Sequence, residues 1–599
     1  MKFGKGAWLV ALAVSAALSA PAARALDEFR LVAEGATEEV ADALGAASVV
    51  NEAFRNKVTD PTELLAAARA DYARMVGALY GEGYYGGVVN ILVDGREAAA
   101  IDPLRTPSQI DSIVIQVQPG PLYRFSQADI APVFDTSTLP EGYAVGQPAK
   151  SGVIQEAVDA SVNTWREIGY AKATVGGQRI VADHPSNALD ASVTIDTGPR
   201  LRFGEMRLDA DSRVSERRLR KIAGFPTGEQ FDPNKLDRTA KRLRDTGVFS
   251  SVALIEADTA NPDGTLDVTA RIVDREPRRF GFGAEYLADE GVTLSAFWLH
   301  RNLLGGAERF RVGAEISGIA GDTGGEDFSF DLELTRPATP SADTDAFLTF
   351  ELASVNEPDY SADSVKLGFG FLRRFDEDIT GRIALEYSLS DETDDTGNTT
   401  FRHLALPIGV TIDRRNSLLN ATDGWYVDAE IAPYFGLSGS ESGTRSTLDL
   451  RGYQQFGGDD KFVVAARVQA GAIYGASITG LPNDLRFYSG GGGTVRGQPY
   501  QSLEIDLGGG VSSGGRSFLG LQSEVRYRVT DNIWAVGFAD WGHISADSTP
   551  GSGGESHAGA GLGVRYDTGI GPIRLDVGVP VGGDTDGGVQ VYIGVGQAF

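Results

Sequence analysis

The residues that most clearly suggest a chemical role lie in one loop, SGGGGTVRGQPYQ at 489–501. There, four glycines precede a single arginine, Arg496. Glycine-rich loops bind phosphate when a strand leads in and Gly-Lys-Ser/Thr opens a helix, but here Pro499 follows instead. A flexible linker would not normally carry an arginine between apolar-rich segments. The remaining alternative is a loop that holds Arg496 in an unusual place. The elements predicted around the loop distinguish among these three alternatives.

Other chemical motifs are scarce. The chain has no cysteine, only five scattered histidines, and neither a G-x-S-x-G elbow nor an H-E-x-x-H pair. DETDDTG from Asp391 resembles a calcium loop, but Arg402 stands where the closing glutamate is needed. We therefore expect no enzyme, no catalytic residues, no cofactor and no metal.

The charge and the N-terminal segment indicate where the protein acts. With 82 acidic and 54 basic residues the formal charge is −28, which disfavours nucleic acid as a partner. Residues 1–25 combine lysines, a short apolar run and the pattern Ala23-Arg24-Ala25, as in a secretory signal peptide. A membrane anchor helix is disfavoured because the run is short and no other apolar stretch of about 18 residues occurs. We expect an exported chain that starts at Leu26.

A repeat of domain size occupies the first half. The phrases QPGPLYRF, DTGPRLRFG and DREPRRFG recur at constant spacing around Pro121, Pro199 and Pro277. Each unit shows strand, helix, helix, strand and strand signals, and its second helix ends near a glycine suited to a left-handed C-cap. We predict three β-α-α-β-β modules at 26–121, 122–199 and 200–277. They are either purely structural or use exposed sheet edges to add a strand from an extended chain.

From 278 to 599 the pattern changes to a period of two, separated by Gly- and Asp-rich turns. At roughly 20 residues per strand and connection this segment predicts some 16 strands, the even number that bacterial membrane barrels favour. The terminal segment GGVQVYIGVGQAF predicts an outward face and an inward face. The outward face is Val589, Val591, Ile593, Val595 and Phe599; the inward face is Gln590, Tyr592, Gly594 and Gly596. A soluble β-sandwich would alternate similarly, but a terminal aromatic residue on an exported chain favours the membrane barrel.

Repeated modules before a barrel resemble the outer-membrane protein assembly superfamily, whose modules are called POTRA domains. The resemblance covers the whole mature chain and is sharpest at FGFGAEYLADEGVTLSAFWLHRNLLGGAERF from Phe280, DRRNSLLNATDGWYVDAEI from Asp413, the 489–501 loop, FADWGHI, GLGVRYDTGIGPIRLDVGVPV and the terminal GVGQAF. Three modules and 16 strands resemble its TamA branch. The implied fold is α+β periplasmic repeats, POTRA 1 to 3, followed by an all-β 16-stranded transmembrane β-barrel at 278–599 in the outer membrane.

The resemblance also implies a role for the loop. In this family the arginine of a V-R-G-F/Y tip folds back into the barrel and pairs with acidic residues, which match Glu524 and Asp540 here. Arg496 would thus be a strut followed by Gly497, not a catalyst, because a desolvated arginine needs carboxylate partners. The aromatic residue usual after the glycine is replaced by Gln498, and we expect Tyr500 to take its place.

The function implied is to help outer-membrane clients such as autotransporters fold into the bilayer. We expect the seam between the first and last strands to open laterally, because glycines weaken both sides. The seam residues would be Gly281, Gly283, Gly594, Gly596 and Phe599. Alternatively, these glycines only fit lumen packing. A separate alternative for the whole protein is a passive pore with periplasmic anchoring modules. Expected partners are outer-membrane lipid and lipopolysaccharide, unfolded clients and a TamB-like periplasm-spanning protein.

Overall fold

The computed structural model describes residues 26–599, apart from 136, 288–290, 322–323, 358, 395–396, 458–460, 509–510, 552, 570 and 584–587. The expected signal peptide, 1–25, lies outside the described residues. Among the helices that are described, none combines the length and apolar character needed to cross a membrane.

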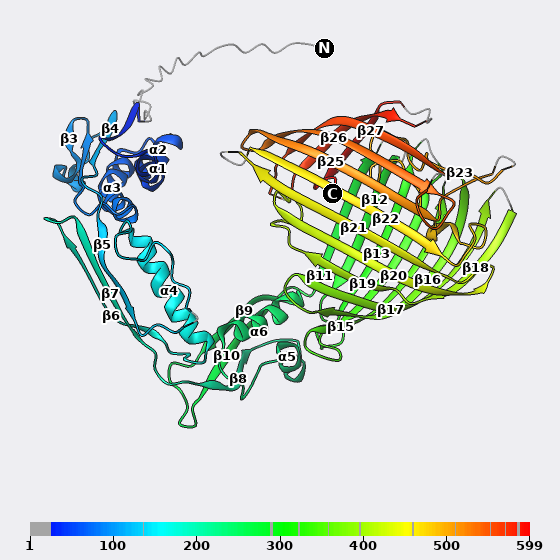
Figure 1. Ribbon diagram of the computed structural model, residues 1–599, viewed down its shortest axis with the longest axis horizontal. Helices are drawn as coiled ribbons and strands as arrows, with labels where there is room; N and C mark the ends of the chain where they lie inside the picture. The colour runs from blue at the N-terminus through cyan, green and yellow to red at the C-terminus, as the bar shows by residue number, and fades with distance from the viewer. Residues whose placement is uncertain are drawn as a thin grey trace, which may run out of the picture. The chain divides into compact units, whose positions relative to one another are not determined.

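The first repeat packs three helices on a sheet of order β1-β4-β2-β3 (Figure 1). Its strands are β1 (Glu28–Ala33), β2 (Val88–Val93), β3 (Arg96–Glu97) and β4 (Ser112–Gln118). Its α-helices are α1 (Glu38–Ala47), α2 (Val49–Arg55) and α3 (Pro61–Gly81), with short 3-10 turns η1 (Ala98–Ala100) and η2 (Pro103–Arg105). Asp60 caps α3 through the Thr62 amide and Pro61 occupies its first turn, a pairing that stabilises helix starts.

The first repeat has three α-helices where two were predicted, and the second repeat also departs from the predicted β-α-α-β-β order. The second repeat contains β5 (Arg124–Ala131), β6 (Thr174–Asp183) and β7 (Ala188–Asp196) in the sheet order β5-β7-β6. The described residues of this repeat form one α-helix, α4 (Ser151–Glu167), where two were expected. The segment 132–150 contains three prolines and two glycines, and prolines lack the amide a helix interior requires.

The third repeat follows the predicted order: β8 (Arg202–Ala210), α5 (Glu216–Ala223), α6 (Pro233–Asp245), β9 (Phe249–Glu256) and β10 (Thr265–Asp274). The predicted helix-ending glycines all adopt left-handed conformations, with φ of 87° at Gly83, 104° at Gly169 and 68° at Gly247. The first two also join neighbouring repeats. The carbonyl of Gly83 accepts a hydrogen bond from the Tyr123 amide at 2.9 Å, and that of Gly169 accepts from the Leu201 amide at 2.8 Å.

The C-terminal half closes into an antiparallel barrel (Figure 1). Its strands are β11 (Arg278–Leu287), β12 (Gly291–His300), β13 (Arg309–Ile319), β14 (Asp327–Arg336), β15 (Thr344–Asn356), β16 (Tyr360–Arg374), β17 (Ile379–Asp394), β18 (Gly397–Ala405), β19 (Ile408–Asp413), β20 (Gly424–Ser438), β21 (Gly443–Phe456), β22 (Phe462–Tyr474), β25 (Ser517–Thr530), β26 (Ile533–Ser545), β27 (Gly554–Tyr566), β28 (Ile573–Gly582) and β29 (Gln590–Val595). Because β18 and β19 both pair with β17 and β20, they are halves of one strand, interrupted near Pro407. The wall formed by the described residues therefore has the 16 strands predicted.

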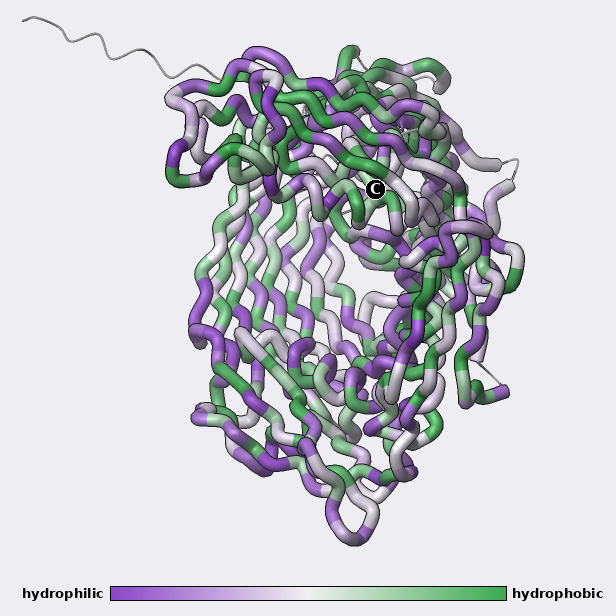
Figure 2. The backbone as a smooth tube through the Cα atoms, turned by 90° about the vertical axis from the view of Figure 1, so that its left-hand side faces the viewer, coloured by the Kyte–Doolittle hydropathy of each residue, from purple (hydrophilic) through white to green (hydrophobic). Residues whose placement is uncertain are grey.

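The alternation of side chains along each strand separates a lipid-type face from a polar lumen. Figure 2 shows hydrophobic and hydrophilic residues alternating along the barrel strands. Ile593 is 43% exposed on the outside, whereas Tyr592 beside it is 1% exposed. Phe599 does not follow the predicted outward face. The chain turns after β29 at Gly596, where φ is 101°, and Phe599 lies buried against Tyr453.

The third repeat packs against the turns at the barrel end where β11 begins. The buried Arg218 donates to the carbonyls of Gly306, at 3.3 Å, and of Pro337. Arg242 makes a two-pronged contact with Asp343, at 2.6 and 2.9 Å. Helices α5 and α6 are thereby fixed to the turns after β12 and β14, near the start of the barrel wall.

Candidate functional site

The segment between β22 and β25, residues 475–516, turns back into the barrel, with short elements η4 (Asn483–Leu485), β23 (Ile505–Asp506) and β24 (Ser512–Ser513). It contacts the wall on two sides. On one side, the Asn483 amide and side chain donate to Glu392 of β17 at 2.9 and 2.8 Å, and Asp484 pairs with Lys366 of β16 at 3.0 Å. On the other, the 489–501 loop reaches β25 to β29. The segment therefore crosses the lumen.

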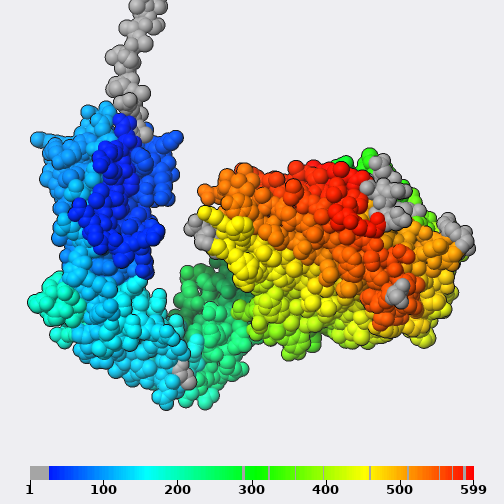
Figure 3. Space-filling model, turned by 45° about the horizontal axis from the view of Figure 1, so that its top comes forward, coloured from blue at the N-terminus to red at the C-terminus, as the bar shows by residue number. Residues whose placement is uncertain are grey.

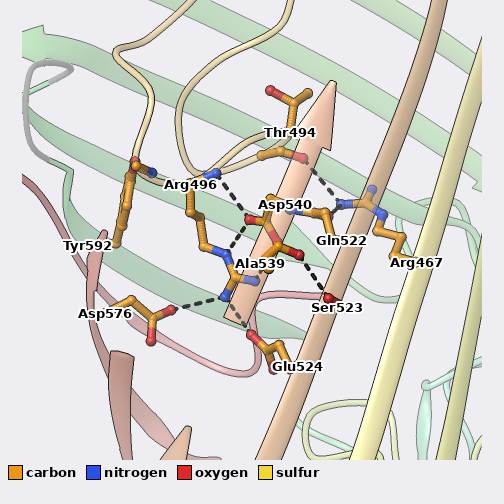
Figure 4. A network of polar contacts seen from close by, with 12 residues as sticks. Arg467, Thr494, Arg496, Gln522, Ser523, Glu524, Ala539, Asp540, Asp576 and Tyr592 are labelled. Carbon is orange, nitrogen blue, oxygen red and sulfur yellow. Dashed lines mark hydrogen bonds and ion pairs between the residues drawn. The ribbon is translucent and has the colours of Figure 1, made fainter. Parts of the chain in front are cut away.

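Arg496 occupies the centre of the second contact, completely buried (Figure 4). Its Nε and Nη2 donate to the Asp540 carboxylate at 2.8 and 3.0 Å, and its own amide donates to the same group at 3.1 Å. Its Nη1 donates to Glu524 and, at 3.4 Å, to Asp576. The guanidinium lies 3.9 Å from the ring centroid of Phe538. The structure thus brings together Arg496, Glu524 and Asp540, as the resemblance implied.

The network is larger than the sequence indicated. Arg565 pairs with Glu524 at 3.3 Å and with Asp576 at 3.1 Å, and Arg526 pairs with Glu524 at 2.8 Å. Three arginines and three carboxylates, each at most 3% exposed, balance in charge. Balance matters because an unpaired buried charge costs several kcal/mol. The only sequence signal for the added members was that they occupy inward positions of their strands.

Glycines let the loop tip lie directly on the wall. Gly497 has φ of 89°, and a Cβ atom there would lie 2.6 Å from the Val579 carbonyl oxygen. On the wall, a Cβ at Gly559 would lie 1.9 Å from the Arg496 carbonyl oxygen, and one at Gly578 would lie 2.9 Å from the Gly497 Cα. These approaches exclude any larger residue without backbone movement. The Gly497 amide also donates to the Tyr592 hydroxyl at 2.9 Å, which ties the loop to the last strand.

The glycine run itself is not arranged as a phosphate cradle. The Gly490 amide donates to the Thr494 hydroxyl at 2.9 Å, and the Gly491 amide donates to the Gln498 carbonyl at 3.1 Å. These donors are used within the loop, so they are not directed at a ligand.

The residues after the tip make polar contacts with the wall and with the turn after β15. Gln498 is buried and its side-chain nitrogen donates to the carbonyls of Ala558 and Gly582, at 2.5 and 2.9 Å. The Tyr500 hydroxyl donates to Glu357, in the turn after β15, at 3.1 Å. Phe538, on β26, places its ring against the Arg496 guanidinium. Where the family usually has an aromatic residue, the Gln498 amide hydrogen-bonds to carbonyls of β27 and β28.

The seam between β11 and β29 is short. β11 pairs with β12 along all its residues, from Arg278 opposite His300 to Leu287 opposite Gly291. With β29 it pairs at two positions in the described chain, Tyr286 opposite Ile593 and Leu287 opposite Tyr592. By contrast, β25 and β26 pair from Ser517 to Thr530. In Figure 3 these two strands lie in the orange part of the barrel surface.

The predicted seam residues divide into three groups. Gly594 lies in the seam, where an added Cβ would be 3.1 Å from Glu285 Oε1 of β11. Gly281 and Gly283 lie beyond the two paired positions and face β12: a Cβ at Gly281 would lie 2.1 Å from the Phe297 ring, and one at Gly283 would lie 2.5 Å from the Ser295 hydroxyl. These close contacts are those expected if the two glycines fit the packing of the lumen side. Gly596 follows the end of β29, and Phe599 lies inside near Arg496, with its ring centroid 6.0 Å from the guanidinium carbon.

One serine and one histidine approach each other in the lumen. Ser489 Oγ lies 2.8 Å from His557 Nε2. His557 Nδ1 has no hydrogen-bond partner among the described residues. No carboxylate among them therefore orients the ring, as an aspartate or glutamate does in a nucleophilic triad. Among the same residues, no group of three His, Cys, Asp or Glu side chains is placed to hold a metal ion.

Comparison with known proteins gives two family matches and several structural ones. Residues 302–599 match the family described as the Omp85 superfamily domain, and residues 202–275 match POTRA, described as the surface antigen variable number repeat. The crystal structure of BamA from Haemophilus ducreyi lacking POTRA domains 1-3 is similar, with 14% identity, a TM-score of 0.59 and coverage of 79% of this chain and 100% of that one. CdiB from Acinetobacter baumannii has 15% identity, a TM-score of 0.52 and coverage of 80% and 90%. CdiB from Escherichia coli has 13% identity, a TM-score of 0.50 and coverage of 80% and 91%. At these identities the likeness establishes the fold.

Proposed function

We propose, from the premise that this chain carries an Omp85 superfamily domain preceded by a POTRA repeat, that it is an outer-membrane assembly factor. Its barrel lies in the outer membrane and its repeats lie in the periplasm. It helps insert or translocate client outer-membrane proteins, such as autotransporters, and the seam between β11 and β29 serves as a lateral gate. Three repeats before a 16-stranded barrel support assignment to the TamA branch.

The short seam is the observation that carries this proposal. In hydrocarbon each unsatisfied backbone N–H or C=O costs several kcal/mol, so separating fully paired strands is prohibitive. Separating β11 from β29 breaks pairing at two positions, compared with the long ladder between β25 and β26. Eight residues of β11, from Arg278 to Glu285, already have no partner on the β29 side among the described pairings. Their backbone groups are available to an incoming strand, which would extend the sheet.

The passive pore is the weaker candidate because the 475–516 segment crosses the lumen. A diffusion channel requires a continuous hydrated passage, and removing this segment would mean breaking the buried Arg496 network and the Asn483–Glu392 contact. Such networks are costly to disrupt. The lumen that remains beside it includes a polar cavity of about 450 Å³ lined by charged residues such as Glu351, Arg382 and Glu430.

The repeats are proposed to guide clients or to bind a TamB-like partner. In the described part of the second repeat, β6 is an edge strand of ten residues with most side chains exposed, including Val175, Ile180 and Val181. Exposed edges of this length present a row of unpaired backbone groups that can bind an extended segment. Lipid and lipopolysaccharide are the proposed surroundings of the barrel's apolar outer face.

The proposal is tested by locking the seam. The chain has no native cysteine, so Tyr286→Cys with Ile593→Cys introduces one defined pair at opposed positions of the seam. Reconstituted in liposomes, the reduced barrel should accelerate folding of an unfolded autotransporter barrel, and oxidation should abolish the acceleration reversibly. Val525→Cys with Gly537→Cys, opposed across β25 and β26, is the matched control and should have no effect when oxidised. An oxidised seam that still accelerates client folding would contradict the gate.

If the protein never accelerates client folding but conducts small solutes freely, the passive pore replaces the assembly function. The two readouts separate the hypotheses because client folding and solute flux are measured in the same liposomes.

A further inference from the structure

The inward face of the seam carries an ion pair that crosses the last strand. Arg574, on β28, lies opposite Gly594 on β29, and its Nη2 is 3.5 Å from Glu285 Oε1 on β11. This ion pair therefore connects the first strand, β11, to the penultimate strand, β28, across the lumen side of the last strand, β29. We propose that the ion pair between Arg574 and Glu285, which we call the latch, holds the gate shut. The absence of a side chain at Gly594 leaves the space in which the two charged side chains meet. This inference rests on the lateral gate of the proposed function.

The strand registers place the three residues in one row. Tyr286 is opposite Ile593, and continuing this antiparallel register brings Glu285 opposite Gly594. Inward positions alternate with outward ones, and Tyr286 and Ile593 are both exposed on the outside. Glu285, Gly594 and Arg574 therefore share the lumen side, immediately beside the last paired position of the seam.

Gly594 is required by the latch for steric reasons. A Cβ atom at this position would lie 3.1 Å from Glu285 Oε1, 3.1 Å from Arg574 Nε and 3.6 Å from Arg574 Nη2. Any side chain there would occupy the path between the two charges. This gives the glycine a role distinct from weakening the strand, because its absence of a side chain allows the strands on either side to interact.

The ion pair of the latch is weak enough to break when the seam opens. Glu285 is 45% exposed in its side chain, and Arg574 Nε has no hydrogen-bond partner among the described residues. Both residues also line a cavity of about 440 Å³ beside Gly490, Thr494 and Tyr500. Arg574 is 12% exposed in its side chain, but water screens the exposed Glu285 carboxylate. We therefore expect the pair to be weaker than the fully buried Arg496 network, so that it biases the seam toward the closed state without locking it.

The test measures the seam without any client. The Tyr286→Cys and Ile593→Cys barrel is reconstituted in phosphatidylcholine liposomes, and the rate of disulfide formation under a fixed mild oxidant reports how much of the time the seam is closed. Adding Glu285→Ala or Arg574→Ala should lower this rate about two- to fivefold, the range expected for a partly exposed ion pair. Gly594→Ala should lower it similarly. The exchange Glu285→Arg with Arg574→Glu should restore the rate.

The control is Arg382→Ala, which removes an ion pair with Glu386 within β17, away from the seam, and should leave the rate unchanged. Heat-modifiable migration in gels checks that each barrel is folded. If the charge exchange does not fold, ionic strength replaces it. Raising salt from 0.01 to 1 M should slow disulfide formation in the parent pair but not in its Glu285→Ala derivative, since salt screens exposed charges.

An unchanged rate in both single variants, or an equal salt response with and without Glu285, would overturn the latch. Failure of the proposed function gives a different pattern, because a locked seam that still accelerates clients leaves these client-free rates untouched.

Discussion

The seam and the wall that faces the Arg496 loop are built from the same kind of strand but are closed by different means. Strands β25 to β28 pair along most of their length and are connected further by the buried cluster of three arginines and three carboxylates. At the seam, β11 pairs with β29 at two positions, and one partly exposed ion pair connects β11 to β28. The contacts that hold neighbouring strands together are therefore more extensive among β25 to β28 than at the seam.

This difference predicts which side of the proposed gate would move. The last strand is tied to the loop through Tyr592 and Gly497, whereas β11 has no comparable side-chain anchor to the loop among the described residues. The turns after β12 and β14 are instead fixed to the third repeat through Arg218 and Arg242. If the proposed gate opens, we expect β29 to stay with the loop and β11 to separate from β29.

The largest expected effect comes from Arg496→Ala, which removes the central arginine of the buried cluster. Glu524, Asp540 and Asp576 would then share two arginines, leaving buried charge uncompensated at a cost of about 3–5 kcal/mol. Urea unfolding of the reconstituted barrel should show this loss. Arg496→Lys should recover only part of it, because lysine cannot make the two-pronged contact with Asp540. A loss below about 1 kcal/mol would show that the wall does not depend on the cluster.

A smaller loss is expected from Gly559→Ala, since a Cβ there would lie 1.9 Å from the Arg496 carbonyl oxygen. The loop tip must lift from β27, at a cost of about 1–3 kcal/mol, typical of overpacking. Gly452→Ala in β21 is the matched control, because an added Cβ meets nothing within 4 Å. Equal unfolding midpoints for the two variants would refute close apposition of the loop and the wall.

Arg218→Ala tests whether the β11 side is coupled to the third repeat. It removes two hydrogen bonds, to the carbonyls of Gly306 and Pro337, and should weaken docking by about 1–3 kcal/mol. Limited proteolysis should then cut between the repeat and the barrel faster than in the parent protein. Arg217→Ala, next to it on α5, is the control. If cleavage rates match, the third repeat is held by other contacts.

A pH-dependent effect concerns the hydrogen bond between the loop and the turn after β15. Burial, reinforced by Asp327, raises the pKa of Glu357 from its ordinary 4.5 to about 7. The folded protein therefore holds a proton that the unfolded chain has released, and stability falls as pH rises from about 4.5 to about 7, then levels off. Glu357→Gln should abolish this dependence in unfolding curves. Tyr500→Phe, which removes the 3.1 Å hydrogen bond but keeps the carboxyl group, should retain it.

Local patterns determined the architecture. Period-two alternation assigned Tyr592 and Ile593 to opposite faces, since neighbouring side chains on a strand point oppositely whatever the strand pairs with. The glycines at 83, 169 and 247 end their helices for an equally local reason, their access to positive φ. Our prediction of two helices in the second repeat was wrong, although three prolines between 132 and 150 are a local signal against a helix there.

The site was only partly readable. Family resemblance supplied Arg496, Glu524 and Asp540, but Arg526, Arg565 and Asp576 join them through strand register, which fixes neighbours far apart in sequence. Register likewise limits β11 and β29 to two paired positions and sets Arg574 beside Glu285. The sequence by itself determined which residues face the lumen, because that property is local to each strand. Only the tertiary structure decided which of them meet, and it turned Phe599 inward, because both depend on how the barrel closes.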